Sequence, residues 1–147
     1  MARWTDLSMN PSIQRRFESK EGVMKAILFV DDHQVLARFS CEILEMQGYR
    51  AVFAFSGNDA LKKFEEDSFD ILVTDFRMEG MNGLELARKV HETHPQMPVI
   101  IVTGYEPVDV GKDALACLQK ESLFPALLEK VKMLLSDAEK AAEAKTA

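Results

Sequence analysis

The sequence predicts a single α/β domain built on one doubly wound sheet of five parallel strands. Short, continuous apolar runs such as residues 25–30 and 99–102 are typical of strands that are buried on both faces. Segments with apolar residues at helical spacing separate these runs. Alternating strands and helices favour parallel βαβ units, whose right-handed crossovers place helices on both faces of the sheet. With 147 residues, 47% of them hydrophobic, the chain can build one core of ordinary size.

Strands and helices alternate in the first part of the chain, in the order strand 25–30, helix 33–47, strand 50–55, helix 58–66, strand 69–74 and helix 83–94. Gly48 and Pro95 supply stop signals after the first and third helices. We expect the Phe and Met residues at helical spacing to belong to the core. In the first helix the apolar residues at helical spacing are Val35, Leu36, Phe39, Ile43, Leu44 and Met46. Among them, this prediction places Phe39 and Met46 in the core.

A fourth apolar run predicts a strand over residues 97–104, and a fifth strand is expected over 115–119. The segment between them, 105–114, is long enough only for a shortened fourth helix. Ser122 can cap a last helix, in whose first turn Pro125 is tolerated. The domain should therefore span residues 24–136. We expect residues 1–23 to be a flexible leader and 137–147 a helical extension or a linker.

Composition limits the classes of function. The formal net charge of −6 and the pI near 5.1 argue against a nucleic-acid or anionic-membrane surface, which would need a basic patch. No apolar run approaches the roughly 20 residues that span a bilayer, and the N-terminus lacks the apolar region of a signal peptide. Cys41 and Cys117 lie in apolar segments, as expected of free thiols in a reducing compartment. We therefore expect a cytoplasmic protein.

Five polar residues stand at the predicted carboxyl ends of four different strands: Asp31, Asp32, Asp75, Thr103 and Lys120. Parallel strands bring these ends to one edge, where ligands bind in open α/β sheets. Crowded carboxylates repel one another and favour a hard divalent cation, and Mg²⁺ fits best because it is held by few carboxylates. The ionised carboxylate of Asp75 would then be a nucleophile toward phosphorus, with Thr103 and Lys120 stabilising phosphoryl oxygens. Alone, each residue would be an ordinary helix cap, turn or surface residue, so only the set carries this prediction.

The same five residues, with Met78, Met81, Asn82 and Gly83 after Asp75 and Gly104 after Thr103, resemble the receiver domain of two-component response regulators over residues 25–136. The resemblance implies a flavodoxin-like (βα)5 fold. It also implies that Asp75 accepts a phosphoryl group from a histidine kinase or a histidine phosphotransfer protein. Such a domain is a signalling phosphoacceptor that catalyses only its own phosphorylation and dephosphorylation.

By the same resemblance, Asp31, Asp32, Asp75 and the backbone carbonyl of Arg77 hold Mg²⁺, while Thr103 and Lys120 bind the phosphoryl oxygens. Arg77 and Tyr105 occupy the positions that flank the path of the hydrolytic water in this family. Two long side chains there predict a phosphoaspartate that hydrolyses slowly.

The chain departs from the family pattern on the side that reports phosphorylation. Glu79 and Glu121 stand where prolines are usual, Cys117 replaces an aromatic switch residue, and the fourth helix is shortened. A second hypothesis is therefore a degenerate receiver that serves as a phosphorylation-independent scaffold. A phosphatase of the haloacid dehalogenase type would need an acid where Arg77 stands. The output partner is unknown from sequence, and a homodimer remains open.

Overall fold

The computed structural model describes residues 24–104, 109, 111–112, 114, 116–119 and 123–146. Its centre is one sheet of five parallel strands in the order β2-β1-β3-β4-β5. The strands are β1 (Ala26–Val30), β2 (Arg50–Ala54), β3 (Ile71–Asp75), β4 (Val99–Thr103) and β5 (Ala116–Gln119). The predicted fold class, a doubly wound parallel sheet, is confirmed.

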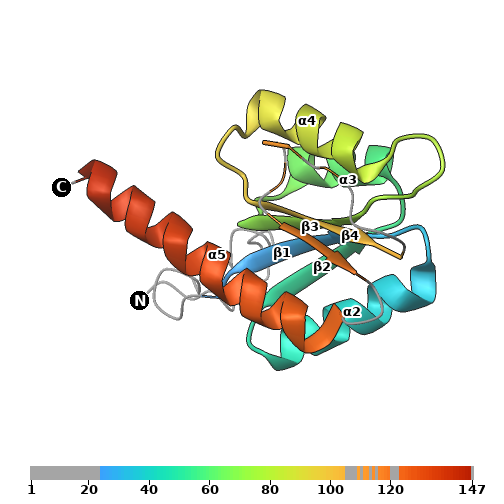
Figure 1. Cartoon of the computed structure of the whole chain (residues 1–147), viewed down its shortest axis with the longest axis horizontal. Coiled ribbons are helices and arrows are strands. Elements are labelled where there is room, and N and C mark those ends of the chain that lie inside the picture. The colour runs from blue at the N-terminus through green and yellow to red at the C-terminus, as the bar shows by residue number, and fades with distance from the viewer. Residues whose placement is uncertain are drawn as a thin grey trace, which may run out of the picture.

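Helices cover both faces of the sheet, as Figure 1 shows. The described helices are α2 (Gln34–Met46), α3 (Gly57–Glu66), α4 (Gly83–Thr93) and α5 (Leu123–Thr146). Helices α3 and α4 lie on one face, and α2 and α5 lie on the other. Ser56 and Asn82 cap α3 and α4 with side-chain oxygens that accept backbone N–H groups, which explains where these two helices begin.

Two hydrophobic layers result because successive side chains of a strand point to opposite faces. In β1, Leu28 and Val30 pack under α3 and α4, while Ile27 and Phe29 pack against α2 and α5. Alternate residues of β3 and β4 divide in the same way. The central strands are therefore buried on both faces, as their continuous apolar runs predict.

Helix α2 is oriented differently from the prediction. Its buried residues are Ala37, Ser40, Cys41 and Leu44, which recur at helical spacing. Phe39 and Met46, which we expected in the core, are 55% and 82% exposed, and Val35 is 73% exposed. The prediction was wrong because two different stripes of this helix repeat at helical spacing, one with Phe39 and the other with Cys41, and the sequence does not show which of them faces the sheet. The stripe of mostly small residues, together with Leu44, faces the sheet, so Val35, Phe39 and Met46 lie on the outer side.

Only five residues between β4 and β5 are described. None of these residues, which are Gly104, Asp109, Gly111, Lys112 and Ala114, is helical. The rest of the predicted short helix over 105–114 lies outside the described residues, as does the predicted leader over 1–23. The described part therefore carries four helices around the five strands.

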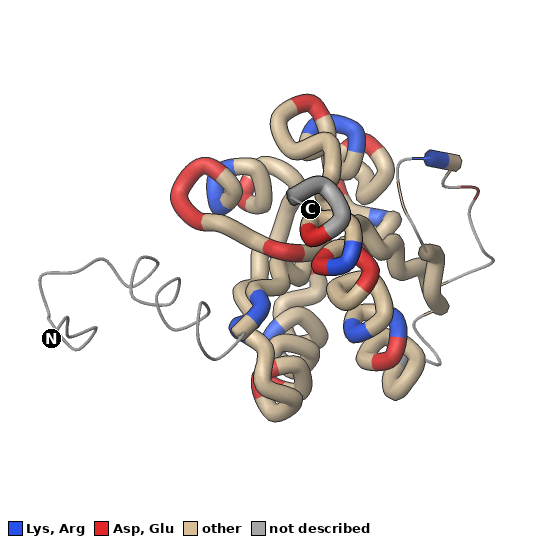
Figure 2. Tube along the Cα trace, turned by 90° about the vertical axis from the view of Figure 1, so that its left-hand side faces the viewer, with Lys and Arg blue, Asp and Glu red and all other residues tan. Residues whose placement is uncertain are grey.

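Helix α5 is the longest element of the fold. The backbone of Phe124 is extended, with φ −106° and ψ 133°, so the regular helix begins at Pro125, close to the predicted start. Its C-terminal part projects beyond the sheet and carries acidic and basic residues on several sides, as the view along α5 in Figure 2 shows. Of the described helices, none is both long and apolar enough to cross a membrane.

Candidate functional site

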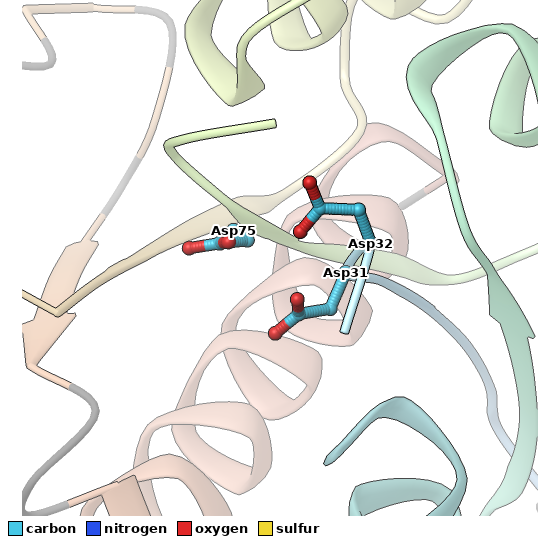
Figure 3. Close-up of side chains that lie close together, drawn as sticks. All are labelled: Asp31, Asp32 and Asp75. Atoms are coloured by element: carbon cyan, nitrogen blue, oxygen red, sulfur yellow. The ribbon is translucent and has the colours of Figure 1, made fainter. Parts of the chain in front are cut away.

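Three carboxylates meet at the carboxyl edge of the sheet. Asp31 follows the last residue of β1, Asp32 comes next, and Asp75 is the last residue of β3. Because β1 and β3 are paired in register up to Val30 and Thr74, Asp31 lies alongside Asp75. One carboxylate oxygen from each of the three aspartates lies within 4.8 Å of the other two. Figure 3 shows the three side chains projecting from the two neighbouring strand ends.

The electrostatics of this cluster suit a cation. Asp31 and Asp75 are only 1% and 4% exposed, whereas Asp32 is exposed. Buried carboxylates in close contact repel one another unless a proton or a cation neutralises them. All three donors are hard oxygens at one edge, and Asp32 leaves the cluster open to solvent. The donor set therefore fits a small divalent ion such as Mg²⁺, which prefers carboxylate and water ligands.

Local hydrogen bonds fix Asp31. Its backbone N–H donates to the carbonyl of Ala54 at 3.0 Å, and its Oδ1 accepts the backbone N–H of His33 at 2.9 Å. His33 also caps α2, because its Nδ1 accepts the N–H of Leu36 at 3.3 Å. Neither aspartate is thus the helix cap, which was the alternative that the sequence left open. The contribution of the His33 backbone was not predicted, since no side-chain pattern signals it.

The backbone around Asp75 is held equally closely. The N–H of Phe76 donates to the carbonyl of Val102 at 2.7 Å, and the hydroxyl of Thr74 donates to the carbonyl of Asp75 at 3.0 Å. Gly83, the first residue of α4, passes directly over this carbonyl. A Cβ at Gly83 would collide with the carbonyl oxygen of Asp75. Only glycine lets the helix begin so close to the acid.

The other predicted residues are placed in part. Thr103 is buried at the end of β4, next to β3, where Asp75 pairs with Val102. It therefore lies on the same edge as the acids. Arg77 is exposed in the loop that follows Asp75. Tyr105, Lys120 and Glu121 lie outside the described residues, so their predicted positions at this edge remain predictions.

Comparison with known proteins identifies the family. The sequence pattern of the response regulator receiver domain matches residues 27–132. The chain belongs to the response regulator receiver domain family. The receiver protein CpdR of Brucella abortus is 34% identical over 91 residues, which are 62% of this chain and 76% of CpdR. The transcriptional regulatory protein ZraR of Klebsiella oxytoca is 34% identical over 113 residues, which are 76% of this chain. The chain spans only 26% of the length of ZraR.

Solved receiver structures agree with this assignment. A CheY-like receiver domain from Methanospirillum hungatei is 33% identical, with a TM-score of 0.74, and the match covers 80% of this chain and 98% of that one. The response regulator TrrA of Thermotoga maritima, crystallised with Mg²⁺ and BeF, is 33% identical, with a TM-score of 0.70 and coverage of 76% and 99%. TrrA has also been crystallised with the histidine kinase ThkA. This receiver therefore has the fold of two-component response regulators, and its acidic pocket fits a phosphoacceptor.

Proposed function

We propose that this receiver accepts a phosphoryl group on Asp75 from the phosphohistidine of a histidine kinase or a histidine phosphotransfer protein. The observation that carries the proposal is the cluster of three carboxylates, two of them buried, at the ends of β1 and β3. A carboxylate oxygen of Asp75 attacks phosphorus, and the P–N bond of the phosphohistidine breaks. The electron pair of that bond stays on the imidazole nitrogen, and an acyl phosphate forms on Asp75.

The remaining residues of the edge would prepare this step. Asp31, Asp32, Asp75 and the backbone carbonyl of Arg77 would hold Mg²⁺, which would neutralise charge on the phosphoryl oxygens. The chain itself fixes the attacking group: the bonds around Phe76 and the closeness of Gly83 hold the backbone of Asp75. We assign Thr103 as a hydrogen-bond donor to a phosphoryl oxygen and Lys120 as a positive charge beside it.

Hydrolysis returns the domain to its resting state, and we propose that Arg77 and Tyr105 slow it. Water must attack phosphorus from outside the pocket, breaking the P–O bond and releasing inorganic phosphate. Arg77 is exposed two residues after Asp75, and a long side chain at this position would narrow that approach. The half-life of the acyl phosphate should lengthen as this approach becomes narrower.

For the partner, we propose a phosphohistidine-bearing protein that binds over α2. Val35 and Phe39 lie in the first two turns of this helix, next to Asp32, and are largely exposed. Exposed apolar residues grouped on one face mark interaction surfaces. The complex of TrrA with a histidine kinase supports a partner of this class. We place the reaction in the cytoplasm, with an output protein whose identity is open.

The decisive test uses a small acyl phosphate as donor. With Mg²⁺ and acetyl phosphate, the intact mass should increase by one phosphoryl group, and Asp75→Asn should abolish the increase while keeping the size and shape of the side chain. Asp70→Asn is the matched control, since Asp70 lies just before the same strand and accepts the N–H of Ala26 instead. If the native chain takes up no phosphoryl group, the alternative of a phosphorylation-independent scaffold stands.

The timing of hydrolysis tests the second assignment. After removal of excess acetyl phosphate, the decay of the phosphorylated mass should be faster in Arg77→Ala and Tyr105→Ala than in the native chain. Arg88→Ala, on the exposed side of α4, is the matched control. Equal half-lives in all variants would show that neither side chain obstructs water.

A further inference from the structure

The loop between Asp75 and α4, residues 76–82, contacts the first turn of α3, where a glycine leaves room for it. Gly57 is the buried first residue of α3. A Cβ at Gly57 would lie 2.7 Å from Sδ of Met81, 3.0 Å from its Cβ and 3.2 Å from its Cγ. Carbon atoms pack at about 3.5–4.0 Å. Any side chain at this position would therefore displace Met81, including the atoms next to its backbone.

Glycine is needed at position 57 because there is no room for a side chain, and not because the backbone conformation requires it. The described glycines with positive φ are Gly48, Gly80 and Gly111, so Gly57 has a conformation that other residues adopt. Alanine is also a better helix former than glycine. On its own, α3 should consequently be stabilised by Gly57→Ala. The conflict arises only through Met81.

The loop that Met81 belongs to is held by backbone hydrogen bonds at its ends and by two methionines between them. At its ends, the N–H of Phe76 bonds to Val102, and the N–H of Gly83 bonds to the carbonyl of Phe76 at 2.8 Å. Between these ends, Met78 is buried and Met81 is half-buried against the core on the side of α3 and α4. Glu79 and Gly80 are exposed. The contact of Met81 with Gly57 thus helps to hold the second half of the loop, together with the Asn82 cap of α4.

We propose that Gly57 is a positioning residue for the acidic site, acting through Met81 on the loop that follows Asp75. The inference rests on the proposed function, because this loop carries the Arg77 carbonyl that would complete the Mg²⁺ ligands. Displacing Met81 moves the loop and with it this carbonyl. Gly83 restricts the same loop directly, by its contact with Asp75, whereas Gly57 restricts it from another helix.

Gly57→Ala should weaken Mg²⁺ binding. Loss of residues that orient metal ligands typically costs about 10–100-fold in affinity, and we expect about tenfold at the lower end because Met81 is flexible. The measurement is a Mg²⁺ titration followed by the backbone amide NMR signals of residues 75–83, together with the rate of phosphorylation by acetyl phosphate. The rate should fall at low Mg²⁺ and recover at saturating Mg²⁺. Asn58→Ala, the exposed neighbour in α3, should match the native chain.

A double variant separates positioning from folding. In a Met81→Ala background, Gly57→Ala should have a much smaller further effect, because Sδ and Cγ of Met81 are gone and only its Cβ, at 3.0 Å, remains. In the Met81→Ala background, Gly57→Ala should leave the temperature of thermal unfolding unchanged or raise it, because alanine is the better helix former. Native Mg²⁺ affinity in Gly57→Ala, or an equal loss with and without Met81, would overturn the inference.

The outcome is distinguishable from failure of the proposed function. If the native chain bound Mg²⁺ but accepted no phosphoryl group, the proposed function would be wrong. The Mg²⁺ affinities of the native chain and of Gly57→Ala would still test the role of Gly57. If the native chain bound no Mg²⁺, the backbone amide NMR signals of residues 75–83 would test the role of Gly57 instead. Shifts of these signals in Gly57→Ala that revert in the double variant support positioning, and unchanged signals overturn it.

Discussion

Helices α2 and α5 cover the same face of the sheet in different ways. Helix α5 buries large side chains, including Leu127, Val131 and Leu134. Helix α2 buries mostly small ones and leaves Val35 and Phe39 in solvent. Since burial of apolar area stabilises a fold, α5 contributes its large side chains to folding, whereas the largest apolar groups of α2 are available to a partner. The comparison indicates that neighbouring helices on one core can serve stability and recognition separately.

The strongest test of this comparison is truncation of a large side chain in each helix. Leu127 is fully buried, so Leu127→Ala should lower the free energy of unfolding by about 2–5 kcal/mol. Phe39→Ala removes a larger side chain from an exposed position and should change it by about 0.5 kcal/mol or less. Urea denaturation measures both. A comparable loss in Phe39→Ala would mean that α2 also depends on its outer face for stability.

If Val35 and Phe39 of α2 bind the partner, truncating them should slow phosphoryl transfer from that partner. Val35→Ala combined with Phe39→Ala should slow transfer from an autophosphorylated histidine kinase by about tenfold, or about 1.4 kcal/mol, as expected for apolar interface residues. Phosphorylation by acetyl phosphate should be unchanged, because the acidic cluster is untouched. Met133→Ala, which truncates an exposed side chain of α5, is the control. A loss with both donors would instead place these residues in support of the acidic site.

A buried hydroxyl in α2 offers a gain of stability. Ser40 is fully buried, and its Oγ has no hydrogen-bond partner within the described part of the chain. Because an unsatisfied buried polar group is costly, Ser40→Ala should raise the free energy of unfolding by about 1 kcal/mol. Ser136→Ala, at an exposed position of α5, controls for the better helix propensity of alanine. An equal gain in the free energy of unfolding in both variants would show that helix propensity, and not removal of the buried hydroxyl, causes it.

The thiol of Cys41 makes α2 sensitive to high pH. Burial, with a smaller effect of the Glu45 carboxylate, raises the pKa of Cys41 from 9.0 to about 12. The folded state therefore keeps a proton that the unfolded state releases above pH 9. This contribution to stability is complete below pH 9 and is lost as the pH rises toward 12. In unfolding titrations between pH 9 and 11, Cys41→Ala should lose stability less steeply than the native chain; parallel curves would contradict this.

The smallest expected effect lies in the projecting part of α5. Lys25 and Glu139 form an ion pair at 3.0 Å, with side chains that are 27% and 46% exposed. Exposed ion pairs contribute about 0–1 kcal/mol, so Glu139→Ala should lower the free energy of unfolding by no more than about 0.5 kcal/mol. Chemical denaturation at low and high salt measures the change, which salt should reduce further. Any larger loss would show that the helix end depends on this contact.

Sequence reasoning succeeded where a residue's place follows from strand geometry. Apolar runs in alternation with helices predicted the parallel sheet, and the end of a strand located Asp31 and Asp75 at one edge. It failed for α2, because Phe39 and Cys41 lie on stripes with the same helical period and only the distance to the sheet decides between them. Gly57 was not predicted, since its importance depends on a contact with Met81, 24 positions further along the chain.

The ion pair between Lys25 and Glu139 also has a consequence for how this domain can be connected to other proteins. It brings the residue before β1 next to the last turns of α5, so chain entry and exit are neighbours. They lie at the amino end of β1, and the acids lie beyond its carboxyl end. The five residues of β1 separate the two by about 17 Å. A sequence joined at either side of the domain would therefore begin at the end of the sheet opposite the acidic edge.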